Sequence, residues 1–370
     1  MQPTKRNPWR LCLFTAWLIL LSVWGLHAQP AFTNRVLELD GKDSYVDLPA
    51  GIFDELTEAT VEMWARWEEM GPSSTLFDYG EDGIEMNIVQ VGGGPNLRFK
   101  VERPSGQGAI MYVGNILRLK DWCHIAAVTG PGGMILYFNG MAVATNDMPG
   151  SFAFTPKGKN HFLGRNTSAK TDPRGFPLFH GQLDEVRVWK VRRTAEQIRA
   201  SMFQALTGKE PGLAGLWNFD NGTVHDATPN GHHGVFRGNA RVVPMPLPAS
   251  AQAVMPSIVF GKVNDDTGKP FRVVLLRLEQ EGRELMQVSA GYQTGLYSFA
   301  INSPDKPFDI EARSDDGNGD LVNWKLGIKL QPGERREINW VLRNKVSITG
   351  IVRSLDWDCF EKVERERGAF

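Results

Sequence analysis

Hydrophobic and polar residues alternate in short runs from about residue 35 to residue 243, and turn residues separate the runs. In residues 60–67, every second residue from Val61 to Trp67 is apolar, the pattern of a strand with one buried face. Asn139 and Gly140 separate two further runs, and both residue types tolerate the positive φ angles of a two-residue hairpin turn. The pattern predicts an antiparallel sandwich over residues 34–243.

One helix interrupts these strands. Thr194 and Gln197 have the spacing of a capping box, which predicts a helix from there to about Leu206. Ile198 and Met202 are four residues apart and would share its buried stripe.

A proline-rich stretch then divides the chain. Prolines at alternate positions deny a strand its N–H donors, so residues 244–256 are predicted to be a linker. Six further strands follow, which predicts a smaller β-sandwich over residues 257–345; they span residues 257–263, 272–278, 295–300, 308–313, 324–330 and 337–342. Residues 347–352 echo residues 257–263, so residues 346–370 are predicted to start an incomplete repeat with a divergent charged tail. We therefore expect the chain to be a fragment of a longer modular protein.

The N-terminal residues have the features of an export signal. Lys5, Arg6 and Arg10 form a basic start, an apolar run follows, and Ala28 is the small residue at the expected cleavage point. Residues 1–28 are predicted to be a cleaved signal peptide, with an uncleaved anchor as the alternative. The mature protein is then secreted, periplasmic or at the cell surface, with no stable membrane span.

Composition narrows the class of protein. The 39 Gly and 22 Pro of 370 residues indicate a turn-rich chain, and 41 basic against 42 acidic residues give no field that attracts nucleic acid. Three Cys are too few for a disulfide scaffold. Cys123 and Cys359, the two in the mature chain, are predicted to be free, with Cys123 packed as a small hydrophobe.

Several segments, in this order, resemble the laminin-G-like jelly rolls of the concanavalin A-like lectin and glucanase superfamily. The resemblance rests on residues 39–41, 60–64, 122–126, 137–140, 181–189 and 217–220, together with the capped helix. The second unit resembles a carboxypeptidase-regulatory-like, transthyretin-type sandwich, a family of non-catalytic spacers, through residues 261–270, 295–299 and 331–334. Together they imply an all-β protein, a jelly-roll sandwich followed by a smaller Ig/transthyretin-like sandwich.

The catalytic chemistry of the superfamily needs two carboxylates in one cleft, commonly from a Glu-x-Asp-x-Glu strand. No such triplet occurs; Glu38 and Asp40 lack a third acid, and a strand would send the adjacent Asp184 and Glu185 to opposite faces. We therefore predict that the chain is not an enzyme and has no catalytic residue.

Metal binding has one candidate pair. The resemblance implies one Ca²⁺, and by position Asp40 and Asp184 are the candidate ligands; the alternative for each is the cap of a turn. His225, His232 and His233 are assigned to a turn, because zinc needs three or four convergent ligands. Residues 315–320 are assigned to an exposed acidic turn. No other cofactor is predicted.

Aromatic residues in the strand runs are assigned to the core; they are Trp64, Trp67, Tyr79, Trp122, Trp189 and Trp217. Loops 77–83, 91–96 and 164–179 are the better candidates for a ligand site. The predicted function is a non-catalytic exported or cell-surface module that binds carbohydrate or an extracellular protein. The alternatives are a structural adhesion or spacer segment, the sensory front of a longer envelope protein, and, third, a glycoside hydrolase.

Overall fold

The computed structural model describes residues 34–81, 84–103, 108–155, 160–167, 178–247, 254–271, 274–291, 294–314 and 321–342. The predicted signal peptide, the tail with Cys359 and residues 315–320 lie outside these residues. So do parts of the predicted linker and of loop 164–179.

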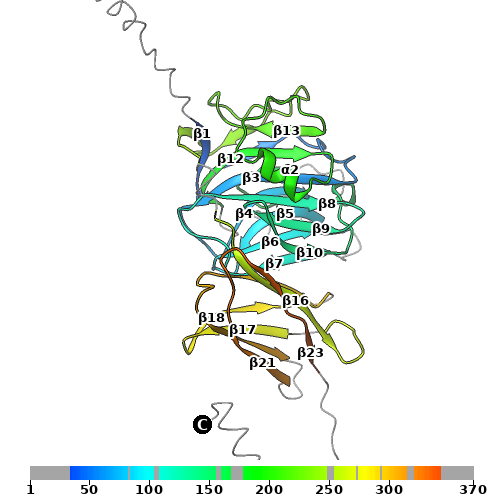
Figure 1. The fold of residues 1–370 in the computed structure, drawn as a ribbon. Coiled ribbons are helices and arrows are strands. Elements are labelled where there is room, and N and C mark those ends of the chain that lie inside the picture. Colours follow the sequence, from blue (N-terminus) through cyan, green and yellow to red (C-terminus); the bar gives the residue numbers. More distant parts are fainter. Residues whose placement is uncertain are drawn as a thin grey trace, which may run out of the picture.

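The first unit consists of two antiparallel sheets (Figure 1). In the described residues, the first sheet has the order β10-β9-β8-β3-β12-β1-β15, with β13 paired to β12. Its strands are β1 (Arg35–Asp40), β3 (Ala59–Trp67), β8 (Cys123–Thr129), β9 (Met134–Phe138), β10 (Met141–Asn146), β12 (His180–Trp189), β13 (Leu213–Trp217) and β15 (Arg241–Pro244). The second sheet has the order β14-β2-β11-β4-β5-β6-β7. Its strands are β2 (Tyr45–Leu48), β4 (Ser73–Glu81), β5 (Ile84–Val91), β6 (Asn96–Val101), β7 (Ala109–Val113), β11 (Asn160–Leu163) and β14 (Val235–Arg237).

Alternation along the strands builds the core between the two sheets. Met63 and Trp67 of β3 point inward from the first sheet, and Phe77 and Phe99 point inward from the second. Burial of such side chains is the main favourable term in folding. The jelly-roll, nearly all-β architecture predicted from the sequence is confirmed.

The hairpin between β9 and β10 also forms as predicted. Asn139 has a φ of 49° and Gly140 a φ of 76°, the positive values that this turn requires.

Helix α2 (Ala195–Ser201) lies on the outward side of the first sheet, and a short 3₁₀ turn, η2 (Phe152–Phe154), follows β10. The Thr194 side chain accepts from Gln197 N and the Gln197 side chain accepts from Thr194 N, so the predicted capping box is present. The predicted end near Leu206 is wrong: the helix ends at Ser201, where side chains of the first sheet bind its last carbonyl groups. Arg187 Nη1 donates to Ser201 O at 3.0 Å, and Trp64 Nε1 donates to Met202 O at 2.8 Å.

The second unit is a smaller sandwich. One of its sheets has β19 (Leu296–Ile301), β16 (Ser257–Asp265) and β22 (Arg335–Glu337), with β23 (Trp340–Leu342) also paired to β16. The other has β18 (Arg283–Ser289), β17 (Val274–Gln280), β20 (Phe308–Ser314) and β21 (Leu321–Ile328). The prediction missed β18, because this edge strand buries only Val288 and so lacks clear alternation. The likeness to carboxypeptidase-regulatory domains stays a prediction.

The two units are in direct contact at the edge of the second sheet (Figure 1). Gly114 N donates to Ser298 O at 3.0 Å, and Ala300 N donates to Gly114 O at 2.8 Å. A Cβ at Gly114 would lie 2.4 Å from the terminal methyl of Met286 and 2.7 Å from a methyl of Val288, so a larger residue here would require these side chains to move. Ile258 of the second unit completes the core of the first. The unit boundary at residues 244–256 stays a prediction.

Candidate functional site

The outward side of the second sheet carries a row of residues that crosses every strand. The strand registers align them in the order Val235, Asp47, Phe162, Asp78, Asn87, Lys100 and Ile110. At about 4.8 Å between strands, the row is roughly 29 Å long. We call these residues, with the neighbouring Glu85, Arg98 and Tyr112, the polar face.

The centre of the polar face is a buried hydrogen-bonded cluster. Asp78 Oδ2 accepts from Asn166 Nδ2 at 2.8 Å, and Glu85 Oε2 accepts from Thr167 Oγ1 at 2.6 Å. Asn87 Nδ2 donates to Glu85 Oε1 at 2.7 Å, and Lys100 Nζ lies 3.0 Å from the same oxygen. Residues 166 and 167 therefore lie over two adjacent carboxylates.

The surroundings shift the pKa values of two groups in this cluster, Asp78 and Lys100. Burial, and then the neighbouring charge of Glu85, raise the pKa of Asp78 well above its ordinary value. Burial lowers the pKa of Lys100, but the carboxylates of Glu85 and Glu102 outweigh burial and leave this pKa raised. Asp78 thus keeps a proton more readily than an exposed carboxyl, and Lys100 stays charged.

Two buried polar atoms of the polar face have no hydrogen-bond partner among the residues that the structure describes. They are Asp78 Oδ1, an acceptor, and Arg98 Nε, a donor. Native proteins rarely leave such groups unpaired, and both atoms here are covered by neighbouring residues. Tyr112 lies directly opposite Arg98 on β7 and is 38% exposed, which gives the site an accessible aromatic ring. This arrangement can bind a ligand that has both hydroxyl groups and an apolar surface.

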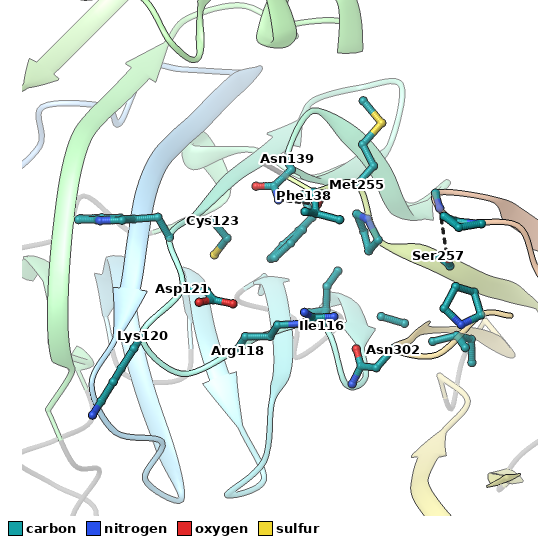
Figure 2. Close-up of a pocket in the computed structure, with 18 of the residues that line it drawn as sticks. Ile116, Arg118, Lys120, Asp121, Cys123, Phe138, Asn139, Met255, Ser257 and Asn302 are labelled. Atoms are coloured by element: carbon teal, nitrogen blue, oxygen red, sulfur yellow. Dashed lines mark hydrogen bonds between the residues drawn. The ribbon is translucent and has the colours of Figure 1, made fainter. Parts of the chain in front are cut away.

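A groove lies between the two units (Figure 2). This interdomain groove has a volume of about 890 Å³, and Ile116, Cys123 and Phe138 form part of its apolar lining. Cys123 is buried, as predicted, and burial raises the pKa of its thiol. Asn139 Nδ2 donates to Val254 O at 2.8 Å and ties the first unit to the segment that enters the second.

The structure does not bring the two predicted calcium ligands together. Asp40 pairs with His180 in the register of β1 and β12, and Asp184 lies four residues further along β12. At about 3.3 Å per residue this separates them by roughly 13 Å, too far for one ion. Calcium binding at either carboxylate stays a prediction.

Both carboxylates are engaged in local hydrogen bonds. Asp40 Oδ1 accepts from the backbone N–H groups of Lys42, Asp43 and Ser44 and from the Ser44 hydroxyl. Burial acts to raise the pKa of Asp40, but these bonds and one from Asn239 outweigh it and hold the pKa well below its usual range. The described residues contain no cluster of three or more His, Cys, Asp or Glu side chains that suits a metal.

Asp184 is in a different environment, and one prediction about it is wrong. It is fully buried and accepts from Asn34 Nδ2 at 2.7 Å, while burial raises its pKa well above the ordinary value. The prediction that Asp184 and Glu185 point to opposite faces fails, because a bulge with Glu185 at a φ of 49° interrupts the alternation. Leu183 and Val186 both face the core, so the two acids between them lie on the other side.

The histidine turn is held by Asp226. Its carboxylate accepts from the backbone N–H groups of Leu216, Thr228 and His232, and His233 Nδ1 accepts from Asp226 N. The assignment of this segment to a turn agrees with these bonds.

The aromatic residues assigned to the core are buried, with one exception. Trp122 is only half-buried and lines the interdomain groove.

Sequence reasoning found only part of the polar face. Residues 77–83 were predicted as a ligand-binding loop and contain Asp78, but the loop assignment is wrong for residues 77–81, which belong to β4 and pair with both of its neighbours. Glu85, Asn87 and Lys100 were missed. A usable signal was present: polar residues alternate along β6 and at Glu85 and Asn87 of β5, and hairpin pairing places Asn87 beside Lys100.

Comparison with known proteins gives a family match over part of the chain. Residues 40–199 match the model of the concanavalin A-like lectin/glucanases superfamily. No curated protein matches the chain.

Solved structures with a similar fold have low sequence identity. A candidate carbohydrate-binding protein from Bacteroides ovatus ATCC 8483 is 23% identical, with 58% of this chain and 61% of that chain covered and a TM-score of 0.46. The present chain thus spans less than two thirds of its length. The CBM40 of a Ruminococcus gnavus sialidase, bound to α2,3-sialyllactose, is 14% identical, with 45% and 95% covered and a TM-score of 0.38. Domain 4 of a GH43 extracellular arabinanase from Geobacillus stearothermophilus, in complex with arabinotriose, is 23% identical, with 45% and 75% covered and a TM-score of 0.36.

Proposed function

We propose, from a jelly-roll fold whose residues 40–199 match the concanavalin A-like lectin/glucanases superfamily, that the chain is a non-catalytic carbohydrate-binding module. The observation that carries the proposal is the polar face, where the exposed ring of Tyr112 lies directly opposite Arg98 on the outward side of the second sheet. Sugars offer hydroxyl groups that donate and accept, together with C–H surfaces that pack on aromatic rings.

The geometry of the carboxylates supports binding over catalysis. A glycosidase needs two carboxyl groups that reach the scissile bond from either side. Asp78 and Glu85 are the acids at the centre of the polar face; Asp78 is fully buried and Glu85 is 3% exposed, under Asn166 and Thr167. A substrate does not reach both groups in this arrangement.

Export is part of the proposal and rests on the sequence of residues 1–28. Within the described ranges, no helix is long and apolar enough to cross a membrane. We propose a secreted, periplasmic or surface location, with the second unit as a stalk.

A glycan array with the purified full chain tests the proposal. We expect binding to a defined set of glycans, and at least tenfold weaker binding in Arg98→Ala and Tyr112→Ala, since each removes a direct contact. Arg283→Ala, an exposed arginine of β18 in the second unit, is the matched control and should bind as the wild type does.

Three outcomes would contradict it. Wild-type glycan binding by both Arg98→Ala and Tyr112→Ala would show that the polar face is not the binding site. An empty array together with capture of one defined extracellular protein would favour an adhesion role. Release of reducing sugar from a bound polysaccharide, lost in Asp78→Asn, would make the chain a hydrolase.

A further inference from the structure

The interdomain groove is built by both units and is held open by direct hydrogen bonds between them. Gly114 exchanges two backbone hydrogen bonds with β19, and Ser298 Oγ donates to Val143 O at 2.6 Å. Asn115 Nδ2 donates to Ala300 O at 3.2 Å beside the groove. A hollow fixed by bonds on both sides is formed before any ligand arrives, which lowers the entropic cost of binding.

The rim of the groove carries polar side chains that the fold itself does not use. Arg118 and Asp121 come from the first unit, and Asn302 and Asp305 come from the second (Figure 2 labels the first three). All four are exposed, and none of their side chains makes a hydrogen bond or ion pair with another described residue. Buried and bonded polar groups stabilise the fold, whereas these four remain available to a ligand.

The floor of the groove is apolar. Ile116 and Phe138 lie below the rim, and the half-buried indole of Trp122 contributes an aromatic surface. A concave site with an apolar floor and a few convergent polar groups is the usual form of a small-molecule site, and its volume of about 890 Å³ suits several linked rings.

The charges at the rim identify the class of ligand. Arg118 and Lys120 are cationic and Asp121 and Asp305 are anionic, so the lining has no net charge. A site for a phosphate, a carboxylate or a cation would concentrate one sign. Neighbouring donors and acceptors of both kinds instead match the adjacent hydroxyl groups of an uncharged sugar, with the apolar floor under its C–H surface.

We propose that the interdomain groove is a second ligand site, which binds an uncharged oligosaccharide between the two units. This inference rests on the proposed carbohydrate-binding function and adds a site to which the second unit contributes Asn302 and Asp305. The second unit then takes part in recognition as well as serving as a stalk.

Calorimetric titration of the full chain with cellohexaose, xylohexaose and maltohexaose tests the site, with a hexamer of galacturonic acid as the charged comparison. We expect at least one neutral hexasaccharide to bind, and binding to weaken about tenfold or more in the double variant Asn302→Ala/Asp305→Ala. The variant Asp121→Ala should show a loss in the same direction from the opposite rim. Asp266→Ala, an exposed aspartate in a turn of the second unit outside the groove, is the charge-matched control.

The result must be separable from binding at the polar face. If the neutral sugar binds the groove, the Tyr112→Ala variant still binds it, whereas the Asn302→Ala/Asp305→Ala variant loses that binding. Wild-type affinity in the double variant, with loss in Tyr112→Ala, would overturn the groove and leave the proposed function standing. Binding of the galacturonic acid hexamer alone would overturn the uncharged ligand. No binding of any probe by the wild type would overturn the groove site, while the glycan array decides the proposed function separately.

Discussion

Several acidic residues at outward strand positions are buried in this molecule. Glu62 sits on β3, where alternation alone indicates a solvent-facing side chain, yet it is fully buried. Its Oε1 accepts from Trp189 Nε1 at 2.9 Å and from Arg193 Nη1 at 2.6 Å. A buried carboxylate of this kind is tolerated because charged and polar partners surround it. The same logic applies to Asp78 on the other sheet, where the partners are fewer.

The raised pKa of Asp78 predicts a pH-dependent stability. Above the ordinary value of 3.8, the folded protein retains this proton while the unfolded chain loses it. The folded state therefore binds more protons, and the free energy of unfolding falls as pH rises towards the folded pKa, by up to about 1.4 kcal/mol per pH unit. Asp78→Asn removes the ionisation, so we expect a flatter pH profile and a more stable protein than wild type at the upper end of the window.

Urea unfolding of the two proteins from pH 4 to pH 8 measures this difference. Other groups, such as Asp184, titrate in both proteins and cancel in the comparison. Asp266→Asn, which changes an exposed turn residue, should leave the profile of the wild type. Parallel profiles for wild type and Asp78→Asn would show that Asp78 ionises normally.

At the scale of elements, local sequence and sheet contacts act together on α2. The capping box starts the helix, and the sheet side chains Trp64 and Arg187 bind the carbonyl groups at its end. In return, Ile198 covers Ala126 and Val128 on the outward side of the first sheet. The helix thus seals the buried charges around Glu62 from solvent.

Thr194→Ala is expected to destabilise the protein by about 1 kcal/mol, because the helix loses an N-cap acceptor for Gln197 N. The measurement is the free energy of unfolding in urea. Thr194→Ser, which keeps the hydroxyl, should restore most of the loss, while equal losses in both variants would show that the methyl group and not the cap matters.

At the scale of the whole molecule, the two units share part of a hydrophobic core in addition to the segment that joins them. Ile258 and Ala300 belong to the core of the first unit, and β19 lies against the edge of β7. This shared apolar surface distinguishes a fixed pair of sandwiches from two freely moving modules.

Limited proteolysis tests this arrangement. We expect cleavage between Val243 and Pro256, and we expect the two resistant pieces to stay together on gel filtration in buffer and to separate in moderate urea. Ala300→Asp, which places a charge in the shared core, should release them without urea. Pieces of the wild type that separate at once in buffer would contradict a stable interface, and a single uncut core would contradict the two-unit division.

The sequence by itself determined the elements whose cause is local. Period-two alternation fixes which side of β3 enters the core, Asn139 and Gly140 fix a hairpin through their φ angles, and Thr194 with Gln197 fixes the start of α2. Each depends on residues a few positions apart, so one sequence suffices to recognise it.

Only the tertiary structure decided which polar residues meet and which are covered. Strand pairing brings Asp78 and Glu85 together, while the register of β1 and β12 keeps Asp40 and Asp184 apart. The bulge at Glu185 reverses a side-chain direction, and the groove at Trp122 exists because a second unit lies against the first. These features depend on register and on contacts between distant segments, which alternation does not encode because it repeats identically along every strand.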